Sequence, residues 1–190
     1  MKLLDRKLVF KGHRVEVYED EIKADDGRVF HYDYVHNRNG AGILLVDDSE
    51  DEEKLIFVKQ YRNTVGKDDI EIPAGCQNFL EEDFLVCALR EAEEETGYIP
   101  AKVYYLTKII AAVGIFDEMT AIYIGTGLEE GCIKRDEDEF IDIVKMTLDE
   151  AVEAVYEGRI IDSKTIIAIL AYKDLKNSER FEKGMMLRKC

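Results

Sequence analysis

The residues best suited to do chemistry are carboxylates crowded into a short segment that ends in Glu91-Ala92-Glu93-Glu94-Glu95. Because each residue of an α-helix turns by about 100°, Glu94 and Glu95 would lie roughly 60° and 40° to either side of Glu91. Apolar residues occupy the adjoining face, namely Leu85, Ala88, Leu89 and Ala92. The spacing therefore predicts a helix that docks on a core and presents three carboxylates on the neighbouring face.

Local helix energetics disfavour this placement of Glu91, Glu94 and Glu95. Like charges three and four residues apart destabilise a helix by about 0.2–0.5 kcal/mol per pair, and the helix dipole disfavours anions near the C-terminus. A hard divalent cation reverses the balance, because carboxylates on one rigid face can hold Mg²⁺ and leave coordination sites for phosphate oxygens. A solvated acidic helix face is the alternative interpretation.

A turn sequence, Glu71-Ile72-Pro73-Ala74-Gly75, precedes the acidic segment. Because Pro and Gly are typical turn residues, this segment can bring a backbone carbonyl next to the helix as a further oxygen ligand. Arg90 lies one step from the acidic face and can pair with Glu93 or Glu94, which would hold a carboxylate in place for a metal. An ordinary surface ion pair is the alternative for Arg90.

Three helices and several strands are expected to position these residues. The acidic helix covers about Glu82–Thr96, with Gly97 as its C-terminal cap. A capping box at Thr147–Glu150 begins a second helix, which ends at Gly158, and a third helix begins near Asp162. Apolar runs predict a buried hairpin and a further strand pair, at Ala41–Asp47 with Leu55–Tyr61 and at Val103–Val113 with Met119–Gly125. We therefore expect a mixed α/β fold, with a sheet covered by helices on its faces.

The first forty residues are predicted to form a small β-rich extension. Leu8–Phe10 and Arg14–Tyr18 flank a turn at Gly12, and Asp25–Gly27 marks a second turn before Val29–Val35. So short a segment cannot hold a core alone, so it must pack on the rest of the chain or on another copy. We divide the chain into an N-terminal segment, a main domain and a C-terminal tail, at residues 1–40, 41–176 and 177–190.

The chain is strongly acidic, since its 190 residues include 26 Lys and Arg against 41 Asp and Glu, for a formal net charge of −15. Such a field repels nucleic acid, whereas a small anion can bind where divalent metal ions neutralise an acidic cluster. The longest apolar runs are too short to span a membrane, and Met1–Lys7 carries charges where a signal peptide needs an apolar stretch. The four cysteines form no C-x-x-C pair. We expect a cytoplasmic protein with no nucleic-acid or membrane partner.

The acidic segment resembles the Nudix hydrolase motif, G-x5-E-x7-R-E-U-x-E-E-x-G-U, in which U is apolar. Arg90–Tyr98 matches its second half, with Tyr98 as a loose apolar match. Counting back from Arg90 gives Glu82 as the first acid, and Gly75 then lies one residue too far upstream; counting forward from Gly75 gives Glu81 instead. Flanking segments are similar to the ADP-ribose pyrophosphatase branch of the family, at Val58–Arg62, Glu71–Gly75 and Gly158–Thr165.

The resemblance implies metal ligands on the helix and on the turn. Glu91 and Glu95 would bind the ion directly, with Glu94 beside them and the Ala74 carbonyl oxygen as a further ligand. The ion would be Mg²⁺, with Mn²⁺ as the alternative. Two or three such ions would neutralise the pyrophosphate, and Arg90 would hold a carboxylate in place.

The family also places a Glu on a loop after the motif as general base. Glu118 matches that position in Gly114–Glu118, where Val113 stands in place of the usual Pro. The catalytic residues implied are therefore Glu118, Glu94 and Arg90.

Substrate binding would involve Arg62, Glu71 and Gly75. The guanidinium of Arg62 would approach the phosphates, because its fork of donors suits oxyanions. Aromatic residues of the N-terminal strands could stack on a base, although such residues more often lie in a core or on a sheet face: Tyr18, Phe30 and Tyr32. In this branch the N-terminal strands exchange between two subunits, so the resemblance implies a homodimer.

The reaction expected from the resemblance is hydrolysis of ADP-ribose to AMP and ribose 5-phosphate, in which Glu118 deprotonates the attacking water. A nucleotide-sugar pyrophosphatase acting on GDP-mannose or UDP-glucose is the near alternative, because the same helix would serve it. A non-catalytic ADP-ribose sensor is a second alternative, which the intact Glu91, Glu94 and Glu95 disfavour. An acidic structural protein would leave the motif unexplained.

Overall fold

The structure, a computed structural model, describes residues 1–49, 51–79, 82–134 and 140–176. These residues divide into two units. The first unit contains Met1–Asn39 together with Ile110–Met119, and the second contains the rest of the described chain from Gly40 onwards. The predicted tail, residues 177–190, lies outside the described residues. The roles expected for residues 1–40 and 41–176 stay predictions.

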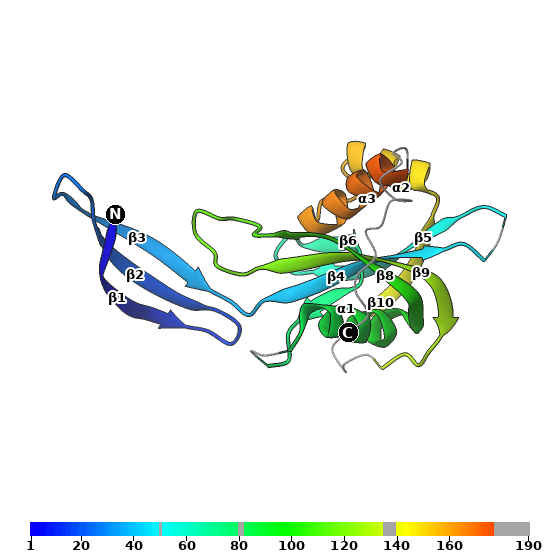
Figure 1. Cartoon of the computed structure of the whole chain (residues 1–190), viewed down its shortest axis with the longest axis horizontal. Coiled ribbons are helices and arrows are strands. Elements are labelled where there is room, and N and C mark those ends of the chain that lie inside the picture. The colour runs from blue at the N-terminus through cyan, green and yellow to red at the C-terminus, as the bar shows by residue number, and fades with distance from the viewer. Residues whose placement is uncertain (50, 80–81, 135–139, 177–190) are drawn as a thin grey trace. The chain divides into compact units, whose positions relative to one another are not determined.

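The first unit is built on a three-stranded antiparallel sheet in the order β1-β2-β3 (Figure 1). Its strands are β1 Lys2–Lys11, β2 Glu16–Lys23 and β3 Val29–His36. The turns predicted at Gly12 and Asp25–Gly27 are confirmed, and Gly27 adopts the left-handed φ of 90° that favours glycine there. Every residue of β1 is exposed, so this sheet has little core of its own.

The second unit contains a seven-stranded mixed sheet whose path runs β10-β5-β4-β9-β8, with β6 paired to β5 and β7 paired to β4. The strands β4 and β9 run parallel, and the other pairs are antiparallel. The strands are β4 Gly40–Asp47, β5 Lys54–Arg62, β6 Lys67–Glu71, β7 Ala74–Cys76, β8 Tyr98–Ile109, β9 Thr120–Glu130 and β10 Ile141–Met146.

Helices cover both faces of this sheet, with α1 on one side and α2 and α3 on the other (Figure 1). The helices are α1 Phe84–Thr96, α2 Leu148–Tyr156 and α3 Ser163–Lys176. The strand β4 is buried on both faces, since Ile43 and Leu45 pack on the α1 side while Leu44 and Val46 pack on the α2 and α3 side. Such two-sided burial produces continuous apolar runs, and the predicted three-layer α/β/α fold is confirmed.

The predicted helices are confirmed together with their caps. The capping box of Thr147 and Glu150 is present at α2, and Gly97 ends α1 in the left-handed conformation. The predicted strand Val103–Val113 is wrong at its C-terminal end. It stops at Ile109 because Ile110–Met119 leaves the sheet and belongs to the first unit. In the described part of the chain, every helix is too short or too polar to cross a membrane.

Candidate active site on helix α1

Helix α1 brings two of the predicted carboxylates into the protein and leaves the third near its surface. Residue exposure is only 8% for Glu91 and 4% for Glu95. The side chain of Glu94 is 33% exposed. A buried carboxylate is costly unless charges or hydrogen bonds compensate for its lost hydration, so the surroundings of these residues decide what they can do.

The turn of β7 lies directly against these carboxylates. A Cβ atom added to Gly75 would stand 2.0 Å from Oε1 of Glu91, so only glycine allows this approach. The backbone N–H of Ala74 donates a hydrogen bond to Oε2 of Glu95 at 3.1 Å. The structure therefore brings Ala74, Gly75, Glu91 and Glu95 together, through the N–H of Ala74, while their roles as metal and substrate ligands stay predictions.

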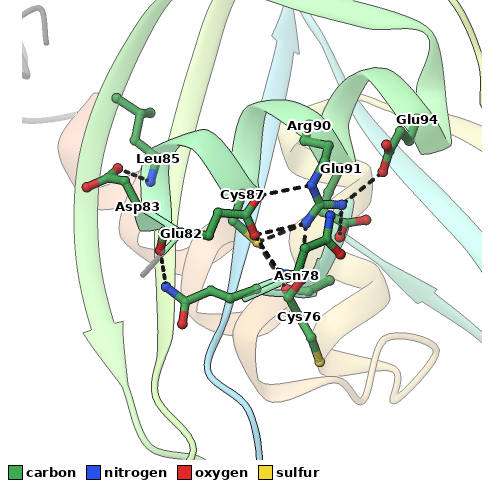
Figure 2. Close-up of polar contacts among 11 residues, drawn as sticks. Cys76, Asn78, Glu82, Asp83, Leu85, Cys87, Arg90, Glu91 and Glu94 are labelled. Atoms are coloured by element: carbon green, nitrogen blue, oxygen red, sulfur yellow. Dashed lines mark hydrogen bonds and ion pairs between the residues drawn. The ribbon is translucent and has the colours of Figure 1, made fainter. Parts of the chain in front are cut away.

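Arg90 lies at the centre of the site (Figure 2). Its Nη1 donates to Oε1 of Glu91 at 2.7 Å and to Oε2 of Glu94 at 2.9 Å. Its Nε donates to Oε1 of Glu82 at 3.1 Å, and its Nη2 donates to the Cys76 carbonyl oxygen at 3.1 Å. One guanidinium thus connects the helix, the turn and the loop between them. Burial alone would lower the pKa of Arg90, but Glu82 and Glu91 raise it, so the side chain stays charged.

The partners of Arg90 were predicted only in part. Glu94 is confirmed, whereas Glu93 instead accepts a hydrogen bond from the backbone N–H of Cys132. The contacts to Glu82 and Glu91 were not foreseen. Because the Arg90 side chain is only 21% exposed, the interpretation as an ordinary surface ion pair is wrong.

Glu82 occupies the position of the first acid in the motif. It is 6% exposed, and besides Arg90 it accepts a hydrogen bond from the backbone N–H of Asn78 at 2.7 Å. The side-chain amide of Gln77 in turn donates to the Glu82 carbonyl oxygen. Burial alone would raise the pKa of Glu82, but the hydrogen bonds from Arg90 and Asn78 and the charge of Arg90 together lower it. The competing residue, Glu81, lies outside the described residues.

The donor set suits a divalent cation. It offers carboxylate oxygens from one rigid helix face beside a backbone turn, the hard oxygen ligands that Mg²⁺ and Mn²⁺ prefer. Among the described residues, no three His, Cys, Asp or Glu side chains converge closely enough to hold a metal as they stand. In this arrangement Nη1 of Arg90 bonds both Glu91 and Glu94, and the backbone N–H of Ala74 engages Glu95.

Arg62 and Glu71 form a second ionic group at the end of β6. The Nε and Nη2 atoms of Arg62 donate to Glu71 at 2.5 and 2.9 Å, and no hydrogen bond from Nη1 is found among the described residues. Lys164 donates to Glu71 at 2.6 Å and lies 3.1 Å from Asp162. The carboxylate of Glu71 is almost fully buried, while the Arg62 side chain is 40% exposed. Glu71 therefore orients an accessible guanidinium, and Lys164 is a member of this group that sequence analysis missed.

Glu118 belongs to the first unit, where Oε2 accepts a hydrogen bond from the side-chain amide of Asn37 at 2.6 Å. Tyr18 packs against Tyr34 with ring centroids 5.6 Å apart, and the Phe30 ring lies 5.3 Å from the Arg28 guanidinium. Tyr32 is half exposed. The general-base role of Glu118 and the stacking roles of Tyr18, Phe30 and Tyr32 stay predictions.

Comparison with known proteins settles the family. The family model described as "NUDIX domain" matches residues 36–167. The chain belongs to the Nudix family. The resemblance carried by Arg90–Tyr98 is thereby confirmed, as is the predicted class of enzyme, a Nudix pyrophosphohydrolase. Nudix hydrolases generally use a divalent metal, in keeping with the oxygen donors around Gly75.

Several relatives of this Nudix chain match along most of their length. The chain is 36% identical to the methanol dehydrogenase activator of Bacillus methanolicus, over 88% of this chain and 90% of that protein. It is 32% identical to the ADP-ribose pyrophosphatase of Bacillus subtilis (strain 168), over 96% and 97%. It is 27% identical to the GDP-mannose pyrophosphatase of Cronobacter sakazakii, over 89% and 93%.

A solved structure shares the fold of this Nudix chain. The crystal structure of an "ADP compounds hydrolase" superimposes with a TM-score of 0.81, covering 94% of this chain and 96% of that one. Sequence identity between the two is 19%, so the match supports the fold alone.

The close approach at Gly75 predicts a large effect from one methyl group. In Gly75→Ala the new Cβ would displace the Glu91 carboxylate, and a misplacement of about 1 Å can lower turnover about 100-fold. We expect Gly75→Ala to lower metal-dependent hydrolysis by about this factor, measured as kcat with saturating metal. Gly12→Ala is the matched control, because its Cβ meets first the exposed ring of Phe10, at 3.1 Å. Equal kcat values for the two variants would show that the close approach of Gly75 to Glu91 does not matter for turnover.

Proposed function

We propose that this chain hydrolyses the pyrophosphate bond of ADP-ribose, giving AMP and ribose 5-phosphate, in a reaction that depends on Mg²⁺. The main support is the hydrogen-bond network of Arg90, which joins the carboxylates of a Nudix helix to the turn at Gly75. The ADP-ribose pyrophosphatase of Bacillus subtilis supports the choice of substrate, since it aligns with 96% of this chain.

The proposed reaction assigns one task to each residue. Glu91, Glu94 and Glu95, with the Ala74 carbonyl oxygen, would hold Mg²⁺, or Mn²⁺ in its place. The bound ion supplies positive charge that stabilises the diphosphate and its leaving group. Arg90 orients the ligand carboxylates through its hydrogen bonds to Glu91 and Glu94.

Substrate contacts and proton transfer fall to residues outside helix α1. The Nη1 edge of Arg62 would donate to a phosphate oxygen while Glu71 holds the other edge of the guanidinium. Glu118 would accept the proton of the water that attacks one phosphorus in line, and the other phosphate would leave.

Product formation from ADP-ribose tests the proposal directly. With Mg²⁺ present, chromatography should show AMP and ribose 5-phosphate appearing in equal amounts, and chelation of the metal should abolish both. Turnover that survives chelation would contradict the metal-dependent mechanism. Tight binding of ADP-ribose without turnover would instead favour a non-catalytic sensor.

A nucleotide-sugar substrate is the second candidate, favoured by the similarity to the GDP-mannose pyrophosphatase of Cronobacter sakazakii. The α1 site serves either substrate, because it acts on the shared diphosphate. Values of kcat/KM for ADP-ribose, GDP-mannose and UDP-glucose decide between them. The proposal requires kcat/KM to be highest for ADP-ribose.

The proposal includes a homodimer that exchanges its N-terminal strands. Support comes from the first unit, whose strand β1 exposes several apolar side chains, on both of its faces: Leu3, Leu4, Leu8, Val9 and Phe10. Burying them against a second copy would remove this apolar surface from water. Light scattering on the purified chain should give the mass of a dimer, and a monomer at micromolar concentration would exclude the exchange.

The proposed location is the cytoplasm. Cys76, Cys87 and Cys132 form no disulfide in the described part of the chain, which suits a reducing compartment. Burial raises the pKa of the Cys87 thiol to about 12, so this residue acts as a small buried apolar group. Cell fractionation tests the location, and recovery outside the cytoplasmic fraction would contradict it.

A further inference from the structure

The loop that carries Glu118 is attached to the N-terminal sheet, although eighty residues of sequence separate them. The backbone N–H of Val35, in β3, donates to the Ile115 carbonyl oxygen at 2.8 Å. The N–H of Asp117 returns a hydrogen bond to the Val35 carbonyl oxygen at 3.3 Å. The loop therefore extends the edge of β3, and both lie within the first unit.

Asp117 fixes this attachment through its side chain. Its carboxylate accepts hydrogen bonds from the Tyr34 hydroxyl at 2.5 Å and from the Asn37 backbone N–H at 3.2 Å, and it lies 2.6 Å from Nδ1 of His36. Burial alone would raise the pKa of Asp117, but the hydrogen bonds from Tyr34 and His36 outweigh it and lower the pKa. Asp117 directly precedes Glu118. Its ionised carboxylate thus keeps this part of the loop in register with the end of β3.

Asn37 then reaches Glu118 itself. Its Oδ1 accepts a hydrogen bond from the backbone N–H of Arg38 at 2.8 Å, which fixes the orientation of the amide. Its Nδ2 consequently faces Glu118 and donates to Oε2 at 2.6 Å. A carboxylate with three rotatable bonds gains a preferred position from such a charge-assisted donor.

The loop's own sequence does little to specify its shape. Val113 replaces the Pro that the family usually has at this point. The side chain of Val113 is largely exposed, and a Cβ added to Gly114 would meet nothing within 4 Å. Within the loop, the Ala112 carbonyl oxygen accepts hydrogen bonds from the N–H groups of Ile115 and Phe116, and the constraints from outside it come from β3 and from the residues that follow β3.

We propose that Asn37 is a positioning residue that holds the Glu118 carboxylate in the orientation from which it accepts the proton of the attacking water. The inference rests on the proposed function, in which Glu118 is the general base. Such a base contributes about 10²–10⁴-fold to rate, and losing its orientation removes part of that factor.

Two neighbouring asparagines allow a charge-matched comparison. Asn37→Asp replaces the donor facing Glu118 by a second carboxylate, whereas Asn39→Asp keeps the Oδ1 acceptor that binds the Met119 N–H at 2.9 Å. Assayed as Mg²⁺-dependent AMP release from ADP-ribose, Asn37→Asp should lower kcat at least about 10-fold with KM changed less than about 2-fold. Asn39→Asp should stay within about 2-fold of the wild type in both. Asn37→Ala, which adds no charge, should follow Asn37→Asp, with thermal midpoints checking that each variant folds.

A double-mutant cycle with Glu118→Gln separates positioning from general support of the fold. Once the base is gone, Asn37→Asp should lower the residual kcat by less than about 2-fold, because residues that act as a unit are strongly non-additive. An equal loss in both backgrounds overturns the inference, as does an Asn37→Asp enzyme that matches Asn39→Asp. Near-normal activity of Glu118→Gln also overturns the inference, because Glu118 would then not be the general base. Failure of the wild type to hydrolyse any diphosphate substrate is a separate result that refutes the proposed function, and this inference with it.

Discussion

Glu91→Gln is expected to lower kcat for ADP-ribose hydrolysis by about 10²–10³-fold while leaving the fold intact. The substitution keeps the size of the side chain but removes an anionic oxygen that lies against the Gly75 turn. It also removes like-charge repulsion with Glu94 and Glu95, worth about 0.2–0.5 kcal/mol per pair, which offsets the weakened hydrogen bond from Arg90. Loss of turnover with little change in thermal midpoint is the signature of a carboxylate retained for metal binding.

The same helix offers a control for this result. Glu95→Gln should behave like Glu91→Gln, whereas Glu93→Gln should keep kcat within about 2-fold, because Glu93 points to the Cys132 backbone. Calorimetric titration with Mg²⁺ should show weaker binding for the first two variants only. A solvated acidic face would make the three variants alike, and near-normal Mg²⁺-dependent turnover by Glu91→Gln would refute the metal assignment.

The site on α1 was largely predictable because its information is local. A helix has a fixed angular step, so the spacing of Glu91, Glu94 and Glu95 is enough by itself to place them on a common face. The left-handed cap at Gly97 and the turn at Gly75 are equally local signals. Residue type and spacing within about 25 positions were therefore sufficient for the helix, its ends and its carboxylates.

The remaining contacts depend on where distant segments meet, and no spacing rule reports that. Lys164 reaches Glu71 across 93 residues of sequence, and Asn37 reaches Glu118 across 81. The contact of Arg90 with Glu82 was not predicted either, because counting from the two ends of the motif gave different residues, Glu81 and Glu82, as its first acid. Strand β10 was missed altogether, since its six residues alternate too briefly to stand out as a pattern.

The buried ionic group around Glu71 has an energetic consequence that depends on pH. Burial alone would raise the pKa of Glu71, but the hydrogen bond from Arg62 and the charge of Lys164 outweigh it and hold the pKa at about 2. The ordinary value is 4.5, so the folded state binds this proton less readily than the unfolded chain. The carboxylate therefore contributes stability that is fully present above pH 4.5 and is lost as pH falls towards 2, on the order of 3 kcal/mol in all.

Glu71→Gln should reproduce this loss at neutral pH. Its amide cannot balance the two cations, and removing one partner of a buried ion pair costs about 3–5 kcal/mol. Urea unfolding should show Glu71→Gln destabilised by that amount at pH 7, with the gap to the wild type closing as pH falls below 4.5. Glu153→Gln, on the exposed side of α2, should differ from the wild type by less than about 0.5 kcal/mol throughout. If the difference in free energy of unfolding between Glu71→Gln and the wild type stays constant with pH, Glu71 stabilises the fold by packing and not by its charge. Arg62 would then lack the ionic partner that directs its Nη1 edge towards a phosphate.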